Sequence, residues 1–240
     1  MLFRSASLLG ETIMLATGKL DLNGAARPRT ASGKDPAIGL RTRLEPTMSL
    51  RAALENVVEL HTFRGGYAGL VLLEDGSANL CISIAKSHLP GEGRATDAIL
   101  AALAADNPLF ADRMGGVQSI GPWSSVANIP YGWRADPDCS GIFRLGDQGA
   151  VIASLAGDGI GIALASGSMA AAAWRNGGAE ASQSFHTALR ARARWPLRVA
   201  GSLKWLAEHP ALHAPAFALM AISPAIAGMA ARATRIGLVR

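Results

Sequence analysis

Between residues 38 and 86, apolar and polar residues alternate, which is typical of strands with one buried face. Strands are predicted at 39–44, 57–63, 65–73 and 78–84, with a short helix at 49–56. Asp75-Gly76 lies between two apolar runs and predicts a hairpin turn. The segment therefore predicts an antiparallel sheet, which often has one face free to cover a ligand. Gly65, Gly66 and Gly69 favour a β-bulge over close approach of a ligand.

Residues 96–114 have apolar side chains at helical spacing, and Asn107-Pro108 is expected to interrupt this helix. The next segment, 117–133, mixes strand and loop signals around Gly and Pro. Its aromatic residues are Trp123, Tyr131 and Trp133. They could line a flat apolar pocket or fill the core near a turn, and the sequence leaves both interpretations open.

The last third of the chain is predicted to be mainly helical. A helix at 159–176 carries no charge before Arg175, so we expect it to be buried. A second helix is predicted at 180–195, where Pro196 interrupts it, and a further helix continues to His209.

Residues 210–231 hold 22 positions without a formal charge, which is long enough to span a membrane. Three prolines interrupt them: Pro210, Pro215 and Pro224. Prolines and many alanines favour short packed helices or a segment at a membrane interface. The N-terminal residues lack the pattern of a secretion signal. We therefore expect a cytoplasmic protein and keep peripheral membrane contact as a hypothesis.

Composition excludes several function classes. Half of the 240 residues are hydrophobic, 17% are charged, and the net charge is +5. No cluster of Lys and Arg alternates with aromatic residues, so no nucleic-acid partner is expected. Cys81 and Cys139 are far apart, and His209 and His213 flank Pro210 without a third ligand nearby. No metal site is expected.

Two turns carry the candidate chemistry. A short strand at 11–18 ends in a Thr-Gly pair before a polar loop at 19–36, and a second strand starts at Phe143. Glycines permit close approach of a flat ligand, a helix N-terminus offers unpaired N–H groups, and a carboxylate after a strand can bind hydroxyls. The candidate binding residues are Ala16, Thr17 and Gly18 in the first turn and Gly146, Asp147, Gln148, Gly157, Asp158, Gly159 and Ile160 around the second.

The second turn, Leu145 to Ile160, resembles the Gly-Asp motif of FAD-dependent oxidoreductases. It is most similar to the p-hydroxybenzoate-hydroxylase-like group, which includes geranylgeranyl reductases, flavin monooxygenases and flavin halogenases. The resemblance implies that Asp147 binds the ribityl or ribose-side hydroxyls of FAD. It also implies that the backbone from Gly157 to Ile160 cradles the pyrimidine end of the flavin ring. The strand ending in Ala16, Thr17 and Gly18 resembles the one beside the adenosine half.

The same resemblance implies an α+β fold, an α/β flavoprotein fragment with three parts. Residues 1–36 and 136–178 would form a partial FAD-binding domain, 37–135 an antiparallel substrate-binding sheet, and 179–240 a helical C-terminal tail. The expected partner is a hydrophobic small-molecule substrate.

This sequence also departs from the family pattern. No G-x-G-x-x-G segment follows a strand, so we expect an N-terminally truncated, split or mis-started member without its βαβ dinucleotide-binding unit. A partner chain could then supply that unit. Gly149 replaces the usual Ala and Ala153 the usual Pro, which predicts a more flexible turn. Arg27 is the nearest equivalent of the arginine that usually follows the first turn.

Two functions follow as hypotheses. The first is an FAD-dependent oxidoreductase, either a monooxygenase or a double-bond reductase, that acts on a hydrophobic or aromatic small molecule. The alternative is a non-catalytic remnant, or a flavoprotein subunit that cannot hold FAD alone. No acid or base is nominated, because surface or core positions are expected for Lys19, His61 and Tyr67.

Overall fold

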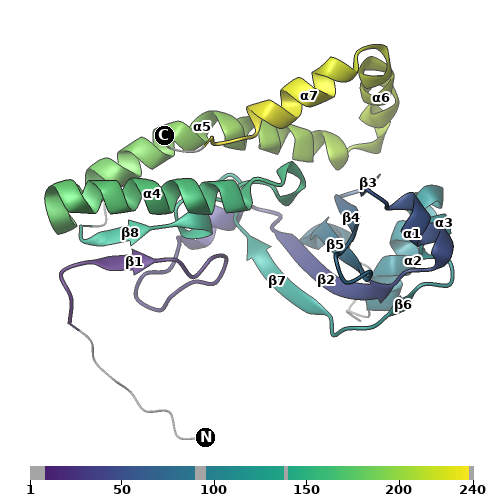
Figure 1. The fold of residues 1–240 in the computed structure, drawn as a ribbon, viewed down its shortest axis with the longest axis horizontal. Coiled ribbons are helices and arrows are strands. Elements are labelled where there is room, and N and C mark those ends of the chain that lie inside the picture. The colour runs from purple at the N-terminus through teal and green to yellow at the C-terminus, as the bar shows by residue number, and fades with distance from the viewer. Residues whose placement is uncertain (1–8, 90–95, 138–139, 238–240) are drawn as a thin grey trace, which may run out of the picture.

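The computed structural model describes residues 9–89, 96–137 and 140–237, which form two sheets and seven α-helices (Figure 1). The larger sheet is antiparallel, with strand order β3-β4-β5-β2-β6, and β7 also pairs with β2. Its strands are β2 (Ala37–Glu45), β3 (Val58–Phe63), β4 (Gly66–Leu72), β5 (Ala78–Ala85), β6 (Gln118–Ser119) and β7 (Ser124–Ile129). The predicted α+β class and the antiparallel sheet are confirmed.

The predicted bulge at the glycine-rich stretch is wrong. β3 pairs with β4 and β4 with β5 in continuous register. Gly65 instead has a φ of 79° in the turn between β3 and β4, and an added Cβ would collide with the His88 ring. Gly66 lies so close to Ser83 O and the Phe63 ring that a Cβ would not fit. The register shift in this sheet lies between Ala37 and Gly39, where β2 pairs with β7.

Three short helices contribute to the core of this sheet: α1 (Met48–Ala53), α2 (Thr96–Asp106) and α3 (Pro108–Met114). The helix break at Asn107-Pro108 is confirmed, because the Asn107 side chain accepts a hydrogen bond from Phe110 N–H (3.0 Å) and caps α3. Phe110 is fully buried against strand residues such as Leu70 and Leu80. Trp123 packs against the same core, which supports a core role for this aromatic residue.

The smaller sheet is a parallel pair of short strands, β1 (Ile13–Leu15) and β8 (Ile142–Arg144). Two long helices, α4 (Gly159–Gly177) and α5 (Ser182–Ala207), share a core with β8. α5 runs through Pro196, so the predicted interruption is wrong. Pro196 is buried, and its neighbours Ala193, Leu197 and Ala200 pack into that core, which offsets the hydrogen bond that proline removes.

The expectation that α4 is buried holds for one face only. Ile162, Ala165, Ser166 and Ala170 are buried. The opposite face carries Ile160, Leu164 and Trp174 with 77%, 59% and 47% of their surface exposed. Positions three or four residues apart lie on one side of a helix, so these side chains form an exposed apolar stripe.

Two further helices follow α5: α6 (His213–Ile222) and α7 (Pro224–Ala233). In the part of the chain that the structure describes, no single helix is long and apolar enough to cross a membrane. Pro210–Ile222 and Ala225–Ala233 reach that length and composition together, but they are bent by 109° at the break between them.

Candidate functional site

The two turns singled out in the sequence meet at one cavity of about 430 Å³. β1 and β8 are parallel neighbours, so the turns that follow them leave the sheet at the same edge. The first turn of α4 closes the third side. The cavity is lined by Ala16, Gly18, Lys19, Leu145, Gly146, Asp147, Gly159, Ile160 and Ala163. Six predicted site residues thus line one space: Ala16, Gly18, Gly146, Asp147, Gly159 and Ile160.

Gly146 has two physical reasons to be glycine. Its φ is 55°, in the left-handed region that favours glycine. An added Cβ would also lie 3.3 Å from the Ala163 Cβ on α4. Its N–H donates to Ser166 Oγ (2.8 Å), and that hydroxyl donates to Ala163 O. Small residues on α4 therefore let the Gly146-Asp147 turn press against the helix.

The Asp147 carboxylate is held in an ion pair at the cavity wall. Lys19 Nζ lies 2.7 Å from Asp147 Oδ2, and both side chains are partly exposed. Lys19 also lines a neighbouring cavity of about 560 Å³, together with Asp21, Arg27, Asn128 and Pro130. Lys19 therefore lines both cavities, and its partner Asp147 lines the 430 Å³ one.

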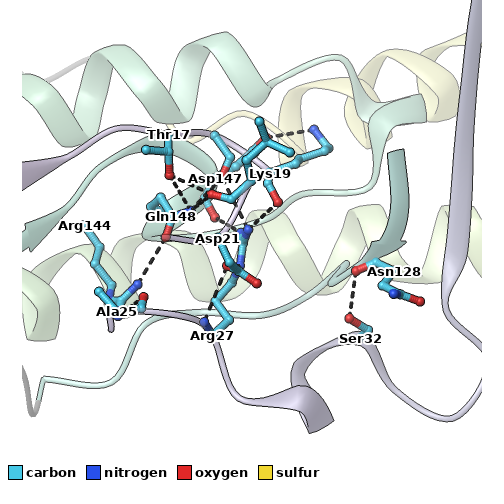
Figure 2. A network of polar contacts seen from close by, with 12 residues as sticks. Thr17, Lys19, Asp21, Ala25, Arg27, Ser32, Asn128, Arg144, Asp147 and Gln148 are labelled. Atoms are coloured by element: carbon cyan, nitrogen blue, oxygen red, sulfur yellow. Dashed lines mark hydrogen bonds and ion pairs between the residues drawn. The ribbon is translucent and has the colours of Figure 1, made fainter. Parts of the chain in front are cut away.

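Arg27 fastens the first turn to the second (Figure 2). Its buried guanidinium donates to Asp147 O (2.9 Å), Lys19 O (2.6 Å) and Asp21 Oδ1 (2.7 Å). It also lies over the Trp133 ring at 5.7 Å, a cation–π distance. A buried arginine needs several acceptors, and here they come from both turns. The sequence singled out this arginine by resemblance alone.

The buried Gln148 side chain holds the first turn in place by hydrogen bonds, one of them to the exposed Thr17 (Figure 2). Gln148 has no exposed surface, and its amide donates to Thr17 Oγ1 (2.9 Å), Gly18 O (3.0 Å) and Leu20 O (2.8 Å). Its carbonyl accepts from Arg144 Nη1 (3.1 Å). These two predicted residues therefore position the turn and do not line the cavity.

Gly149 lies where the neighbouring atoms leave no room for a side chain. The expectation that this glycine makes the turn more flexible is therefore corrected. Its φ is −96°, which any residue can adopt. An added Cβ would lie 2.7 Å from Leu189 Cδ2 and would also collide with Arg144 O. Alanine would not fit here without movement of both the Arg144 backbone and the Leu189 side chain on α5.

At the N-terminus of α4 the backbone N–H groups lack partners within the helix, whereas the side chain of Asp158 is already hydrogen-bonded. The first described bond of the helix runs from Ile162 N–H to Asp158 O (3.0 Å), so the N–H groups of Gly159, Ile160 and Gly161 precede it. An added Cβ at Gly157 or Gly159 would meet nothing within 4 Å. This backbone can therefore approach a ligand closely.

The Asp158 carboxylate points away from the cavity wall. Its Oδ2 accepts from Ile236 N–H (2.7 Å), and its Oδ1 lies 3.2 Å from Arg235 Nη1. Arg235 also donates to Gly157 O (3.1 Å). The segment after α7 thus binds the first turn of α4, a contact between residues 77 and 78 positions apart that no local sequence signal announces.

The remaining polar candidates lie in the core, as expected. His61 is 2% exposed, donates a hydrogen bond from Nε2 to the Glu59 carboxylate (3.1 Å), and packs edge-on against Phe110. Tyr67 is buried, and its hydroxyl accepts from Leu155 N–H (3.1 Å), which ties the large sheet to the turn before α4. Burial raises the pKa of the Tyr67 hydroxyl, so it stays protonated.

Comparison with known proteins gives a fold and no sequence family. No family model and no curated protein matches the chain. Among solved structures, the flavin-dependent brominase Bmp2 matches with a TM-score of 0.65 and 15% identity, over 96% of this chain and 59% of that chain. CmlS, a flavin-dependent halogenase, matches with a TM-score of 0.57 and 16% identity, over 78% and 35%.

A geranylgeranyl bacteriochlorophyll reductase-like protein from Thermoplasma acidophilum matches with a TM-score of 0.56 and 12% identity. That match covers 82% of this chain and 50% of the other. The chain therefore spans between about a third and three fifths of these proteins. Its fold is similar to the matching parts of these solved structures.

Proposed function

We propose that the chain forms the flavin-facing part of an FAD-dependent oxidoreductase. The observation that supports this most is the 430 Å³ cavity, because it joins a positioned carboxylate to an open helix N-terminus. The proposed reaction is a hydroxylation or a double-bond reduction of a hydrophobic or aromatic small molecule. The flavin-dependent proteins of similar fold support the cofactor class.

The residues around the cavity fit the hydroxylated and ring portions of FAD. Asp147 would accept hydrogen bonds from ribityl or ribose hydroxyls, and Lys19 holds that carboxylate in place. The N–H groups of Gly159 and Ile160 would favour negative charge on the ring, as a helix N-terminus does. FAD, once bound, would supply the redox chemistry. The protein would orient it and keep water away.

The neighbouring 560 Å³ cavity is the proposed place for the substrate. It lies between the loop after β1 and strand β7, and it shares Lys19 with the cofactor cavity. Pro28, Pro36, Ala127 and Pro130 give it apolar wall surface. Lys19 is then the residue placed to contact both the cofactor and the substrate.

The test is uptake of FAD by the purified chain. We expect flavin absorbance bands to remain with the protein after incubation with FAD and gel filtration. Asp147→Ala should weaken FAD binding by about 1.5–3 kcal/mol, or about 10- to 150-fold, because a hydrogen bond to a charged group is lost. Asp136→Ala is the matched control, since this carboxylate pairs with Arg190 away from the cavity.

Equal FAD affinity of Asp147→Ala and the unmodified chain would contradict the assignment of Asp147. A colourless chain that takes up no flavin under any condition would contradict binding by the chain alone and would leave the second candidate.

The second candidate is a subunit that holds FAD only together with a βαβ unit from a partner chain. The outer edge of β1 favours it. Ile13 N–H and Leu15 O bond to the β8 side (2.9 Å each), so the N–H and C=O of Met14 point to the other side. Met14 and Trp174 border a further cavity of about 420 Å³ at that edge.

The exposed apolar stripe of α4 lies beside this edge and favours the same partner. Parallel sheets are normally covered by helices on both faces, and a two-stranded sheet is marginal by itself. A strand paired with β1 and a helix packed on Ile160 and Leu164 would complete both features. The proposed partner is therefore a βαβ dinucleotide-binding unit.

This candidate is tested by fusing such a unit ahead of β1 and comparing FAD retention with that of the unfused chain. We expect retention only in the fusion, and its loss when Leu164→Asp places a charge on the stripe. FAD retention that is equal in both proteins would favour the first candidate and overturn the second.

A further inference from the structure

The C-terminal helical layer differs in charge from the rest of the chain. Helices α5, α6 and α7 form the upper edge of the molecule in Figure 1. From Ala181 to Gly237, where the described part of the layer ends, the sequence contains seven Lys or Arg residues and one acidic residue, Glu208. The net charge of the whole chain is only +5, so the positive charge is concentrated in this layer.

The outward face of α5 combines tryptophan with arginine. Trp195 and Trp205 have 63% and 55% of their surface exposed, and Arg194 and Arg198 are exposed as well. Arg194 and Trp195 are adjacent, Arg198 follows one turn later and Trp205 two turns after that, so the four share the face opposite the buried one. Tryptophan and arginine both favour the boundary between apolar and aqueous surroundings.

α6 and α7 add a large apolar surface that the chain itself does not cover. α6 has no buried residue among those described, although only its first residue, His213, is polar. Phe217, Ile222 and Met229 are 56%, 82% and 54% exposed. A helix that is apolar all round is normally buried in protein or in lipid. The described residues of the protein leave α6 without a buried side chain.

We propose that this layer binds the surface of an anionic lipid bilayer. The hairpin α6–α7, which carries no charge before Arg232, would enter the headgroup region, and Arg194 and Arg198 of α5 would pair with lipid phosphates. A nucleic acid would match the arginines but not Phe217 and Ile222. A protein partner would need acidic residues arranged around an apolar centre. An anionic bilayer provides negative charge and an apolar interior along one continuous surface.

Both ends of the hairpin are fixed to the body of the protein. At its start, His213 Nδ1 forms a hydrogen bond with Thr62 Oγ1 on β3 (3.2 Å). At its end, Ile236 N–H donates to the Asp158 carboxylate at the first turn of α4 (2.7 Å). A membrane contact on α6 and α7 would therefore connect directly to the wall of the candidate cofactor cavity.

The test is co-sedimentation of the purified chain, without FAD, with phosphatidylcholine vesicles that contain or lack phosphatidylglycerol. We expect binding to the anionic vesicles that weakens as salt rises. The double variant Phe217→Asp/Ile222→Asp should bind about tenfold more weakly or worse, because its apolar contact is replaced by charge. Arg194→Gln/Arg198→Gln should lose about fivefold for each arginine.

Met48→Asp is the matched control. Met48 has the same exposure as Ile222, 82%, but lies on α1, outside the layer. It should leave binding unchanged, and circular dichroism should show the same helix content in all variants. Failure of the unmodified chain to bind anionic vesicles, or equal binding by the Phe217/Ile222 variant, would overturn the proposal. So would a chain that is dimeric without lipid, fails to bind vesicles and becomes monomeric in the Phe217/Ile222 variant.

Discussion

The two sheets of this molecule differ in how completely the chain stabilises them. The antiparallel sheet pairs strands of six to nine residues over most of its width, and β3, β4 and β5 follow one another along the chain. The parallel pair joins three-residue strands that are about 130 residues apart, and its outer edge is open at Met14. The first sheet combines the local pairings of β3, β4 and β5 with more distant pairings of β2, and it has its own core. The second depends on distant segments and on whatever occupies its open edge.

The strongest way to probe this difference is to compare a core residue with a residue of the α4 stripe. Phe110 is fully buried beneath the antiparallel sheet, so Phe110→Ala should cost about 3–5 kcal/mol of unfolding free energy. Leu164→Ala removes an exposed side chain and should change it by about 0.5 kcal/mol or less. Urea denaturation of both variants measures the contrast. A large loss for Leu164→Ala would mean that the stripe is already covered by other copies of the chain.

The next test concerns the turn between β8 and α4. Gly149→Ala should destabilise the protein by about 1–3 kcal/mol, because the new methyl group would collide with Leu189 and Arg144 O. Gly159→Ala meets nothing within 4 Å and has no positive φ, so it should be neutral or slightly stabilising. Thermal denaturation measures both. Equal effects of the two variants would contradict the tight fit assigned to Gly149.

These glycines show where sequence patterns are sufficient and where they fail. The alternation at 38–86 and the Asn107-Pro108 break depend on neighbours in the chain, so strands and helices were predicted there correctly. Gly149 looked like a source of flexibility, because its lack of space comes from the folded positions of Arg144 O and of Leu189 on α5, which is 40 residues away. Pro196 looked like a helix end for the same reason, since tertiary packing keeps α5 continuous.

In the candidate site, too, some residues could be predicted from local motifs and others depend on contacts between distant segments. Its Thr-Gly and Gly-Asp turns could be found from short motifs, and the parallel pairing of β1 with β8 brings them together. The contacts of Asp158 with Arg235 and Ile236 could not be found, because no periodicity relates them. The internal role of Gln148 was also hidden, since a polar residue beside a motif resembles a ligand contact until its burial is known.

The link from the C-terminal segment to α4 provides a smaller test. Asp158→Asn keeps an acceptor for Ile236 N–H but loses the charge that faces Arg235. We expect the free energy of unfolding to fall by about 0.5–1.5 kcal/mol, which is the net contribution of one hydrogen bond to stability. Increased hydrogen exchange at Ile236 in this variant would confirm the link. The same exchange rate as in the unmodified chain would show that other contacts hold the segment.

The smallest expected effect is the acid sensitivity of the two sheets, each of which has a buried histidine in it or against it: His61 lies on β3, and His186 lies on α5 and bonds to β8. Burial lowers the pKa of His61, and nearby Glu59 opposes that shift. Burial also lowers the pKa of His186, and the charge of Arg144 lowers it further. The pKa of such a histidine is lower in the folded protein than in the unfolded chain, where it is near 6.5. The histidine therefore stabilises the fold at pH values above 6.5, and this contribution is lost as the pH falls through the pKa of the folded state.

His186 is therefore expected to make the parallel sheet more sensitive to acid than His61 makes the antiparallel one. His186 Nε2 accepts from Arg144 N–H of β8 (3.2 Å), and protonation would abolish that acceptor. Unfolding free energy measured in urea between pH 7.5 and 5 should fall less steeply for His186→Gln than for the unmodified chain, because glutamine does not titrate. His61→Gln should alter the slope less, since Glu59 compensates for the charge on His61. A larger change of slope for His61→Gln would reverse the order and place the acid-sensitive contact in the antiparallel sheet.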